Sequence, residues 1–144
     1  MKYALPLLLS LCLLGLAHAE QKQSFGPYDV HYSIVNTTFL KPDVAKAYGI
    51  TRGDDRFIIN ISVRENLDDG GDVARRSSVT GTVFNLIHRN KLDFQEVDEG
   101  EAIYYIAQYS ADNKETLDFT MSIQPDTSQR AYKLQFNQIH YTGK

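Results

Sequence analysis

The chain has 144 residues, with 15 Lys and Arg against 18 Asp and Glu and a formal net charge of −3. This length suits one domain, and the acidic balance disfavours nucleic acid or an anionic membrane surface as a partner. The one cysteine, Cys12, lies in an N-terminal apolar run, so the rest of the chain has neither disulfides nor thiol chemistry.

Residues 1–19 have the three parts of a secretory signal peptide. Lys2 gives a positive start, residues 4–16 are apolar, and Ala17-His18-Ala19 is a small-residue cleavage site. A membrane-spanning helix needs about 20 apolar residues, so we expect no membrane span after cleavage behind Ala19. An exported chain without disulfides favours the bacterial periplasm over the small disulfide-stapled secreted domains.

The exported chain then divides into a leader and one domain. Residues 20–27 are predicted to be a loose polar leader, and residues 28–144 a single β-domain. Apolar and polar residues alternate over residues 28–34, 57–63 and 117–123, which is typical of antiparallel strands with one face on a core. Weaker strands are expected over residues 79–85, 92–97 and 131–141.

Two further segments complete the predicted fold. Residues 41–49 have Pro near the start and Gly at the end, which predicts a two-turn helix between the first two strands. Residues 102–109 are apolar or aromatic on both faces, as in a central strand or a contact surface. With about seven short strands, the pattern predicts an all-β, two-layer antiparallel β-sandwich of immunoglobulin-like shape.

Asp29, His31 and Ser33 bear the three side chains of a hydrolytic triad at every second position. Alternate residues of a strand lie roughly 6.6–7 Å apart and point the same way, whereas a triad needs hydrogen-bonding distance between side chains that usually come from different elements. We therefore predict a solvated strand face, and no catalytic residue is assigned. The alternative is a hydrolase or ligand-binding enzyme whose site is built around His31 from residues distant in sequence.

The sequence offers little for metals or cofactors. The histidines after residue 19 show no metal-ligand spacing, so we expect no cofactor. Asp68, Asp69 and Asp72 gather carboxylates on a Gly-containing loop, which makes them a weak calcium candidate, although the twelve-residue calcium-loop pattern is absent.

Aromatic residues are the best candidates for contact with a partner. Tyr104 and Tyr105 are adjacent, so they point to opposite faces of a strand, and only one face of a two-layer sandwich is core. The other ring, with Tyr109, Tyr32 and His31, is a predicted ligand or partner contact. The competing interpretation is that these tyrosines are half-buried and pack across strands without a partner.

Five segments in the same order resemble one family: FGPYDVHY (residues 25–32), NTTFL (36–40), AYGI (47–50), NISV (60–63) and EAIYYIA (101–107). They resemble the exported gammaproteobacterial proteins classed as domain of unknown function 4426. The resemblance implies a periplasmic single-domain β-protein and carries over no catalytic residue.

The functional prediction is a non-catalytic binding or interaction module of the cell envelope. The expected partner is an envelope protein or an extended peptide, because a sandwich has edge strands that can pair with another strand. The enzyme built around His31 and a purely structural role remain alternatives.

Overall fold

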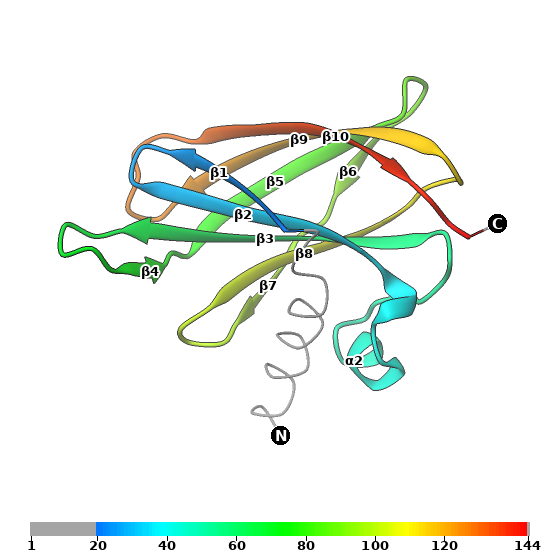
Figure 1. Ribbon diagram of the computed structural model, residues 1–144, viewed down its shortest axis with the longest axis horizontal. Helices are drawn as coiled ribbons and strands as arrows, with labels where there is room; N and C mark the ends of the chain where they lie inside the picture. The colour runs from blue at the N-terminus through cyan, green and yellow to red at the C-terminus, as the bar shows by residue number, and fades with distance from the viewer. Residues whose placement is uncertain (1–19, 144) are drawn as a thin grey trace.

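The computed structural model describes residues 20–143, which form two antiparallel β-sheets packed face to face (Figure 1). The predicted two-layer all-β sandwich is confirmed. The strands number ten, more than the seven or so expected, because short strands without clear alternation also pair.

The first sheet has the strand order β1-β2-β3-β8-β7, and β4 pairs with the C-terminal end of β3. Its strands are β1 (Gln21–Phe25), β2 (Tyr28–Asn36), β3 (Arg56–Asn66), β4 (Asp72–Ala74), β7 (Gln95–Asp98) and β8 (Ile103–Ser110).

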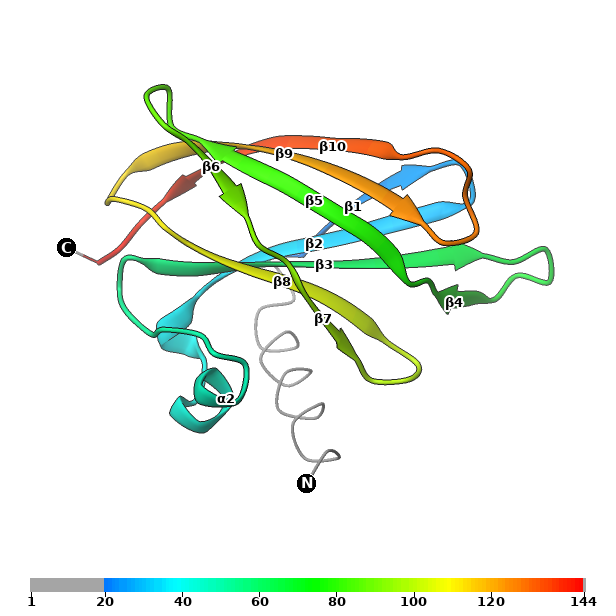
Figure 2. The ribbon, with the colours of Figure 1, turned by 180° about the vertical axis from the view of Figure 1, so that it is seen from behind.

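The second sheet has the strand order β10-β9-β5-β6. Its strands are β5 (Ser77–Phe84), β6 (Arg89–Leu92), β9 (Glu115–Pro125) and β10 (Tyr132–His140). The chain passes between the sheets three times, from β4 into β5, from β6 into β7 and from β8 into β9 (Figure 2).

The prediction of a loose leader over residues 20–27 is wrong. Residues Gln21–Phe25 form the edge strand β1, and all five pair with β2. A tight turn at Gly26, whose φ is 59°, folds β1 back onto β2. Four of the five side chains of β1 are exposed, so the strand is held by its backbone pairing with β2. Because the sequence there lacks apolar alternation, it does not predict a strand.

The core between the sheets consists of the inward side chains that the alternation predicts. Val30, Ile59, Ile61 and Met121 are among its fully buried members, and all but the methionine come from β2 and β3 of the first sheet. Because side chains alternate along a strand, these rows meet face to face with the inward rows of the second sheet.

A second apolar cluster covers one end of the outer face of the first sheet. There the helix α2 (Pro42–Ala47) and the 3₁₀ turn η2 (Thr37–Phe39) pack on outward side chains of β2, β3 and β8. The buried members are Val35, Leu40, Ala45, Ile50, Ile58 and Ile106.

The predicted helix over residues 41–49 is confirmed as α2, with Pro42 as its first residue and Gly49 at φ 67° just past its end. Since β1 precedes β2, the helix connects β2 to β3. It covers the face of a sheet, whereas the sequence predicts that Val44, Ala47 and Tyr48 form an apolar stripe that closes one end of the core. The expected stripe also differs, because Ala45 is buried and Ala47 is exposed.

The predicted signal peptide, residues 1–19, lies outside the described residues. Within residues 20–143, no helix has the length and apolar character needed to cross a membrane.

Candidate binding face

Two of the predicted contact tyrosines lie in the core. Tyr105 is 4% exposed and Tyr109 is 7% exposed. The hydroxyl of Tyr105 donates to Glu96 Oε1 over 2.8 Å and accepts from the backbone N–H of Ser77 over 2.7 Å. Burial is the main reason that the pKa of Tyr105 is raised to about 12. These two rings therefore connect parts of the sandwich and are not available to a partner.

Tyr104 and Tyr32 are half-buried. Tyr104 packs against the α2 cluster on the outer face of the first sheet. Tyr32 stacks on Phe136 with ring centroids 4.5 Å apart, so it joins β2 of one sheet to β10 of the other. The strand that carries Tyr104 lies between β3 and β7 and is not an edge. These positions favour the interpretation in which the tyrosines pack across strands.

Asp29, His31 and Ser33 do not come together. Asp29 accepts hydrogen bonds from Ser24 and Asn66, and these bonds, the one from Ser24 first, lower its pKa against the opposing effect of burial. His31 Nδ1 lies 3.2 Å from Glu20 Oε1, and Ser33 is buried. The three side chains lie in a row on β2, as strand geometry predicts. His31 does not line either of the two hollows on the second sheet.

The carboxylates of the calcium candidate loop have other partners. Asp69 Oδ1 accepts from the N–H of Gly71 over 2.9 Å, and Asp72 Oδ1 accepts from Arg64 Nε over 2.8 Å. Asp68 is exposed. Over the described part of the chain, no group of three or more His, Cys, Asp and Glu is placed to hold a metal ion.

The most distinctive surface of the described chain is the outer face of the second sheet. Hydroxyl-bearing side chains of the central strands β5 and β9 point outward there, because their neighbours Val79, Val83, Phe119 and Ile123 face the core. The register aligns these hydroxyl groups in rows across the sheet. We call this surface the hydroxyl face; it comprises Thr80, Thr82, Thr120 and Ser122, with Lys91 and Lys133 on the flanking strands.

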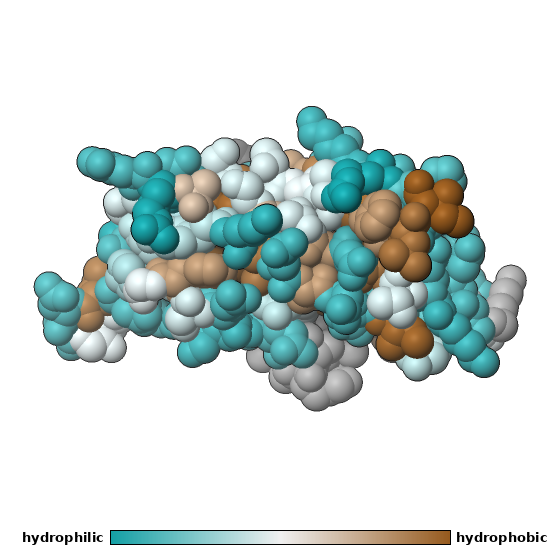
Figure 3. Space-filling view, turned by 90° about the horizontal axis from the view of Figure 1, so that it is seen from above, coloured by the Kyte–Doolittle hydropathy of each residue, from teal (hydrophilic) through white to brown (hydrophobic). Residues whose placement is uncertain are grey.

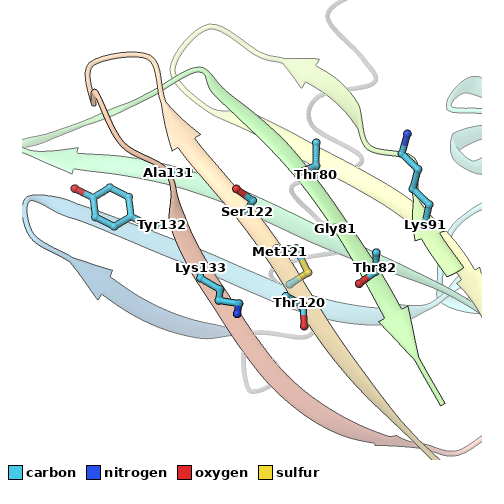
Figure 4. Close-up of a pocket in the computed structure, with 10 residues that line it drawn as sticks. All are labelled: Thr80, Gly81, Thr82, Lys91, Thr120, Met121, Ser122, Ala131, Tyr132 and Lys133. Atoms are coloured by element: carbon cyan, nitrogen blue, oxygen red, sulfur yellow. The ribbon is translucent and has the colours of Figure 1, made fainter. Parts of the chain in front are cut away.

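Two rows cross the hydroxyl face. In one, Thr82 pairs with Lys91 of β6 and with Thr120 of β9. In the other, Ser122 pairs with Thr80 of β5 and Lys133 of β10. Figure 4 shows the two lysines on opposite sides of the hydroxyl groups.

A hollow of about 510 Å³ lies over these rows. Gly81 and Met121 also line it, and a Cβ atom at Gly81 would point away from the hollow into the core, where the buried Met121 lies. The remaining lining comes from Ala131, Tyr132 and the six residues of the hydroxyl face (Figure 4).

The charge of the hollow differs from that of the whole chain. Its ten lining residues include Lys91 and Lys133 and no Asp or Glu, although the chain as a whole has a net charge of −3. A second hollow of about 450 Å³ adjoins the first at Thr120 and contains Arg89 and the carboxylate of Asp118. The hydroxyl face therefore offers hydrogen-bonding groups between two ammonium groups, neither of which forms an ion pair within residues 20–143.

Sequence reasoning did not identify this face. The residues TGT (80–82) and TMS (120–122) look like the solvated side of ordinary strands. The available signal was that both triplets put hydroxyls on one side, but only the register between β5 and β9 brings them together.

Solved structures share this fold. A crystal structure of a DUF4426 family protein from Pseudomonas aeruginosa PAO1 is 34% identical, with a TM-score of 0.74, and the alignment covers 86% of this chain and 96% of that one. A copper-bound variant of FetP from uropathogenic Escherichia coli is 7% identical with a TM-score of 0.57, over 85% of this chain and 95% of that one.

A second FetP structure, of protein expressed in the periplasm of Escherichia coli, has 7% identity and a TM-score of 0.56, and the alignment covers 85% of this chain and 94% of that one. At such low identity the likeness to FetP extends to the fold alone. No curated protein matches the sequence significantly. The model of the family described as Domain of unknown function (DUF4426) matches residues 22–143, and the chain belongs to this family.

Proposed function

We propose that this protein is a non-catalytic binding module of the bacterial periplasm, and that its hydroxyl face binds an extended acidic segment of an envelope protein. The observation that carries the proposal is the hollow flanked by Lys91 and Lys133 without a carboxylate in its lining, on a chain that is acidic overall. Opposite charge across an interface promotes encounter and selects partners.

The geometry of the face suits an extended chain. Lys91 and Lys133 lie on the outer strands of a four-stranded sheet, three strand spacings of about 4.8 Å apart, and in rows that are two residues, or about 7 Å, apart along the strands. The two positions are therefore about 16 Å apart, and because an extended peptide rises about 3.3 Å per residue, two carboxylates about five residues apart would reach both ammonium groups. Thr80, Thr82 and Thr120 between them can donate to and accept from a peptide backbone.

Two considerations support the periplasm. Residues 1–19 have the pattern of a signal peptide, and one FetP structure was obtained from protein expressed in that compartment. Copper binding is not carried over from FetP, because residues 20–143 contain no cluster of metal-binding side chains and their one methionine, Met121, is buried in the core.

The alternative hydrolase built around His31 has less support. It requires a pocket in which His31 meets a carboxylate and a hydroxyl from other strands. In the described structure the side-chain partner of His31 is Glu20, which lies 3.2 Å away at the edge of the first sheet.

The experiment is a titration of ¹⁵N-labelled protein with a glutamate-rich hexapeptide, with a lysine-rich hexapeptide as the reference. We expect amide shifts concentrated at Thr80, Thr82, Thr120 and Ser122 with the acidic peptide, and binding that weakens as salt is added. Shifts spread over the whole surface, or equal shifts with both peptides, would contradict the proposal.

A charge-reversal pair gives the matched control. Lys91→Glu combined with Lys133→Glu should weaken binding by about tenfold or more, because attraction becomes repulsion at both ends of the hollow. Lys41→Glu combined with Lys46→Glu makes the same change in net charge at two exposed positions, the N-cap and the last turn of α2, outside the hydroxyl face, and should leave affinity nearly unchanged. An equal loss in both variants would show that only net charge matters.

A further inference from the structure

Exposed hydrophobic side chains are concentrated at one end of the sandwich. This end, which we call the apolar end, is where β2, β5, β8 and β10 finish and β3, β6 and β9 begin. Among the described residues, six large hydrophobic side chains are exposed, and only Leu67 lies at the opposite end. The five at the apolar end are Phe39, Leu86, Ile87, Ile139 and Tyr141.

The space-filling view shows the same asymmetry. Strongly hydrophobic surface gathers at the right-hand end of the molecule, and little appears at the left-hand end (Figure 3). The hairpin between β5 and β6 projects beyond the sheets at that end (Figure 1). Leu86 and Ile87, at its tip, are 80% and 78% exposed, so neither side chain contributes much to the folding of this chain.

The tip is held in a defined conformation. The side-chain oxygen of Asn85 accepts from the N–H groups of Ile87 and His88, over 3.2 and 2.8 Å. The amide nitrogen of Asn85 donates to Glu115 at the start of β9 over 3.1 Å. Leu86 has a φ of 78°, which is unfavourable for a residue other than glycine. The backbone therefore presents two aliphatic side chains to solvent, and the first of them, Leu86, has an unfavourable backbone conformation.

Cationic side chains follow the tip directly. Arg89 and Lys91 are exposed on β6, and Arg89 lies 4.7 Å from the centre of the Phe84 ring. Two carboxylates lie near the same hairpin: Glu115 is hydrogen-bonded to Asn85, and Asp118 pairs in register with Phe84. The two cationic side chains balance these two carboxylates, so the hairpin lacks the negative charge of the chain as a whole.

We infer that the Leu86–Ile87 tip inserts into the interface of an anionic lipid bilayer, with Arg89 and Lys91 against the headgroups. A narrow convex tip with two adjacent aliphatic side chains can enter the acyl boundary, and nearby basic side chains add attraction to anionic lipid. Tyr141 and Phe39, exposed at the same end, are aromatic residues of the kind enriched at membrane interfaces. This contact is peripheral and depends on Leu86 and Ile87, which lie outside the hydroxyl face, while Lys91 belongs to both surfaces.

The test uses the exported protein beginning at Glu20, which contains no cysteine. Leu86→Cys carries an environment-sensitive fluorophore at the tip, and Leu67→Cys carries the same fluorophore at the opposite end. Vesicles of phosphatidylcholine with one quarter phosphatidylglycerol should shift the tip fluorophore to shorter wavelength and leave the other unchanged. Vesicles of pure phosphatidylcholine should give a weaker response.

Unlabelled variants measure the contribution of the side chains. Leu86→Ser with Ile87→Ser should reduce co-sedimentation with the anionic vesicles by about tenfold or more, since the transfer of two aliphatic side chains is lost. Leu67→Ser should bind as the unaltered protein does. Thermal unfolding of both variants should be nearly unchanged, because the substituted side chains are exposed.

Three results would overturn the inference. The first is no vesicle binding by the unaltered protein. The second is an equal fluorescence response at positions 86 and 67. The third is an oligomer in sedimentation velocity that Leu86→Ser abolishes while vesicles have no effect, which would assign the tip to a contact between copies of the chain.

Discussion

The hydroxyl oxygen of Tyr109 lies 2.7 Å from Nε2 of His140, inside the core of the sandwich. Nδ1 of His140 is 3.0 Å from the carbonyl oxygen of Gln138. A carbonyl only accepts, so Nδ1 carries a proton; because burial lowers the pKa of His140, Nε2 is unprotonated in neutral solution and accepts from the tyrosine. The imidazole is therefore neutral, and the rings of Phe57 and Phe119 are among its neighbours.

This pair predicts that stability falls in mild acid. Burial lowers the pKa of His140 below its ordinary value of about 6.5. Below that pH the unfolded chain binds a proton that the folded chain does not, so the free energy of unfolding decreases as the pH drops through 6.5 toward the folded-state pKa. Urea midpoints at pH 7.5 and 5.5 measure the effect.

The variant His140→Gln tests the assignment of that pH dependence. In this variant the free energy of unfolding should differ less between pH 7.5 and pH 5.5, whatever effect the substitution has on stability at either pH. The carboxylates of Asp29 and Glu65, whose pKa values are lowered, titrate in more acidic solution and do not interfere. A variant as pH-dependent as the unaltered protein would show that other groups are responsible.

Tyr109→Phe should destabilise the fold by about 1–3 kcal/mol, because a buried ring nitrogen loses its hydrogen-bond donor. Replacing both partners removes the unsatisfied group, so Tyr109→Phe with His140→Leu should cost less than the sum of the two single changes. Chemical denaturation of the four proteins gives the coupling energy. If the losses of unfolding free energy in the two single variants add up to the loss in the double variant, the hydrogen bond is contradicted.

Gly81→Ala should destabilise by about 1–3 kcal/mol through overpacking. A Cβ atom at Gly81 would lie 2.7 Å from Cγ of Met121 and 3.0 Å from the backbone oxygen of Thr120. Gly71→Ala is the matched control, because its nearest contact would be Asp69 Oδ1 at 3.4 Å. Melting temperatures of the two variants should differ clearly, and equal values would be inconsistent with close packing under the hydroxyl face.

Tyr105 predicts a loss of stability in alkaline solution. Its pKa is raised to about 12 in the folded chain, mainly by burial, against an ordinary value near 10. Between these values the unfolded chain has released a proton that the folded chain retains, so the free energy of unfolding falls as the pH rises. Tyr105→Phe should make that fall shallower between pH 10 and 12, with Tyr109 responsible for part of the remainder.

The same substitution has an effect at neutral pH. Tyr105→Phe leaves the N–H of Ser77 without the acceptor at 2.7 Å, and should cost about 1–2 kcal/mol at pH 7. Urea denaturation at pH 7 and pH 11 separates the two effects. A variant with unaltered stability at both would contradict the hydrogen bonds assigned to Tyr105.

The core could be predicted from the sequence because the side-chain period of a strand is local. The alternation over residues 57–63 and 117–123 determines which residues face inward, whatever lies opposite. Residues 41–49 similarly carry their own helix signals in Pro42 and Gly49. The predicted contact tyrosines mark the limit of this reasoning: adjacency places Tyr104 and Tyr105 on opposite faces, but it does not say what covers each face.

The all-β class, the alternating faces of the long strands and the short helix can be predicted from the sequence alone, since they depend on neighbours within a few residues. The tertiary structure decided that Gln21–Phe25 pairs as an edge strand and that α2 covers Ile58 and Ile106. It also decided that Lys91 and Lys133 flank one hydroxyl face. These features depend on register and packing between segments far apart in the chain, which no local pattern specifies.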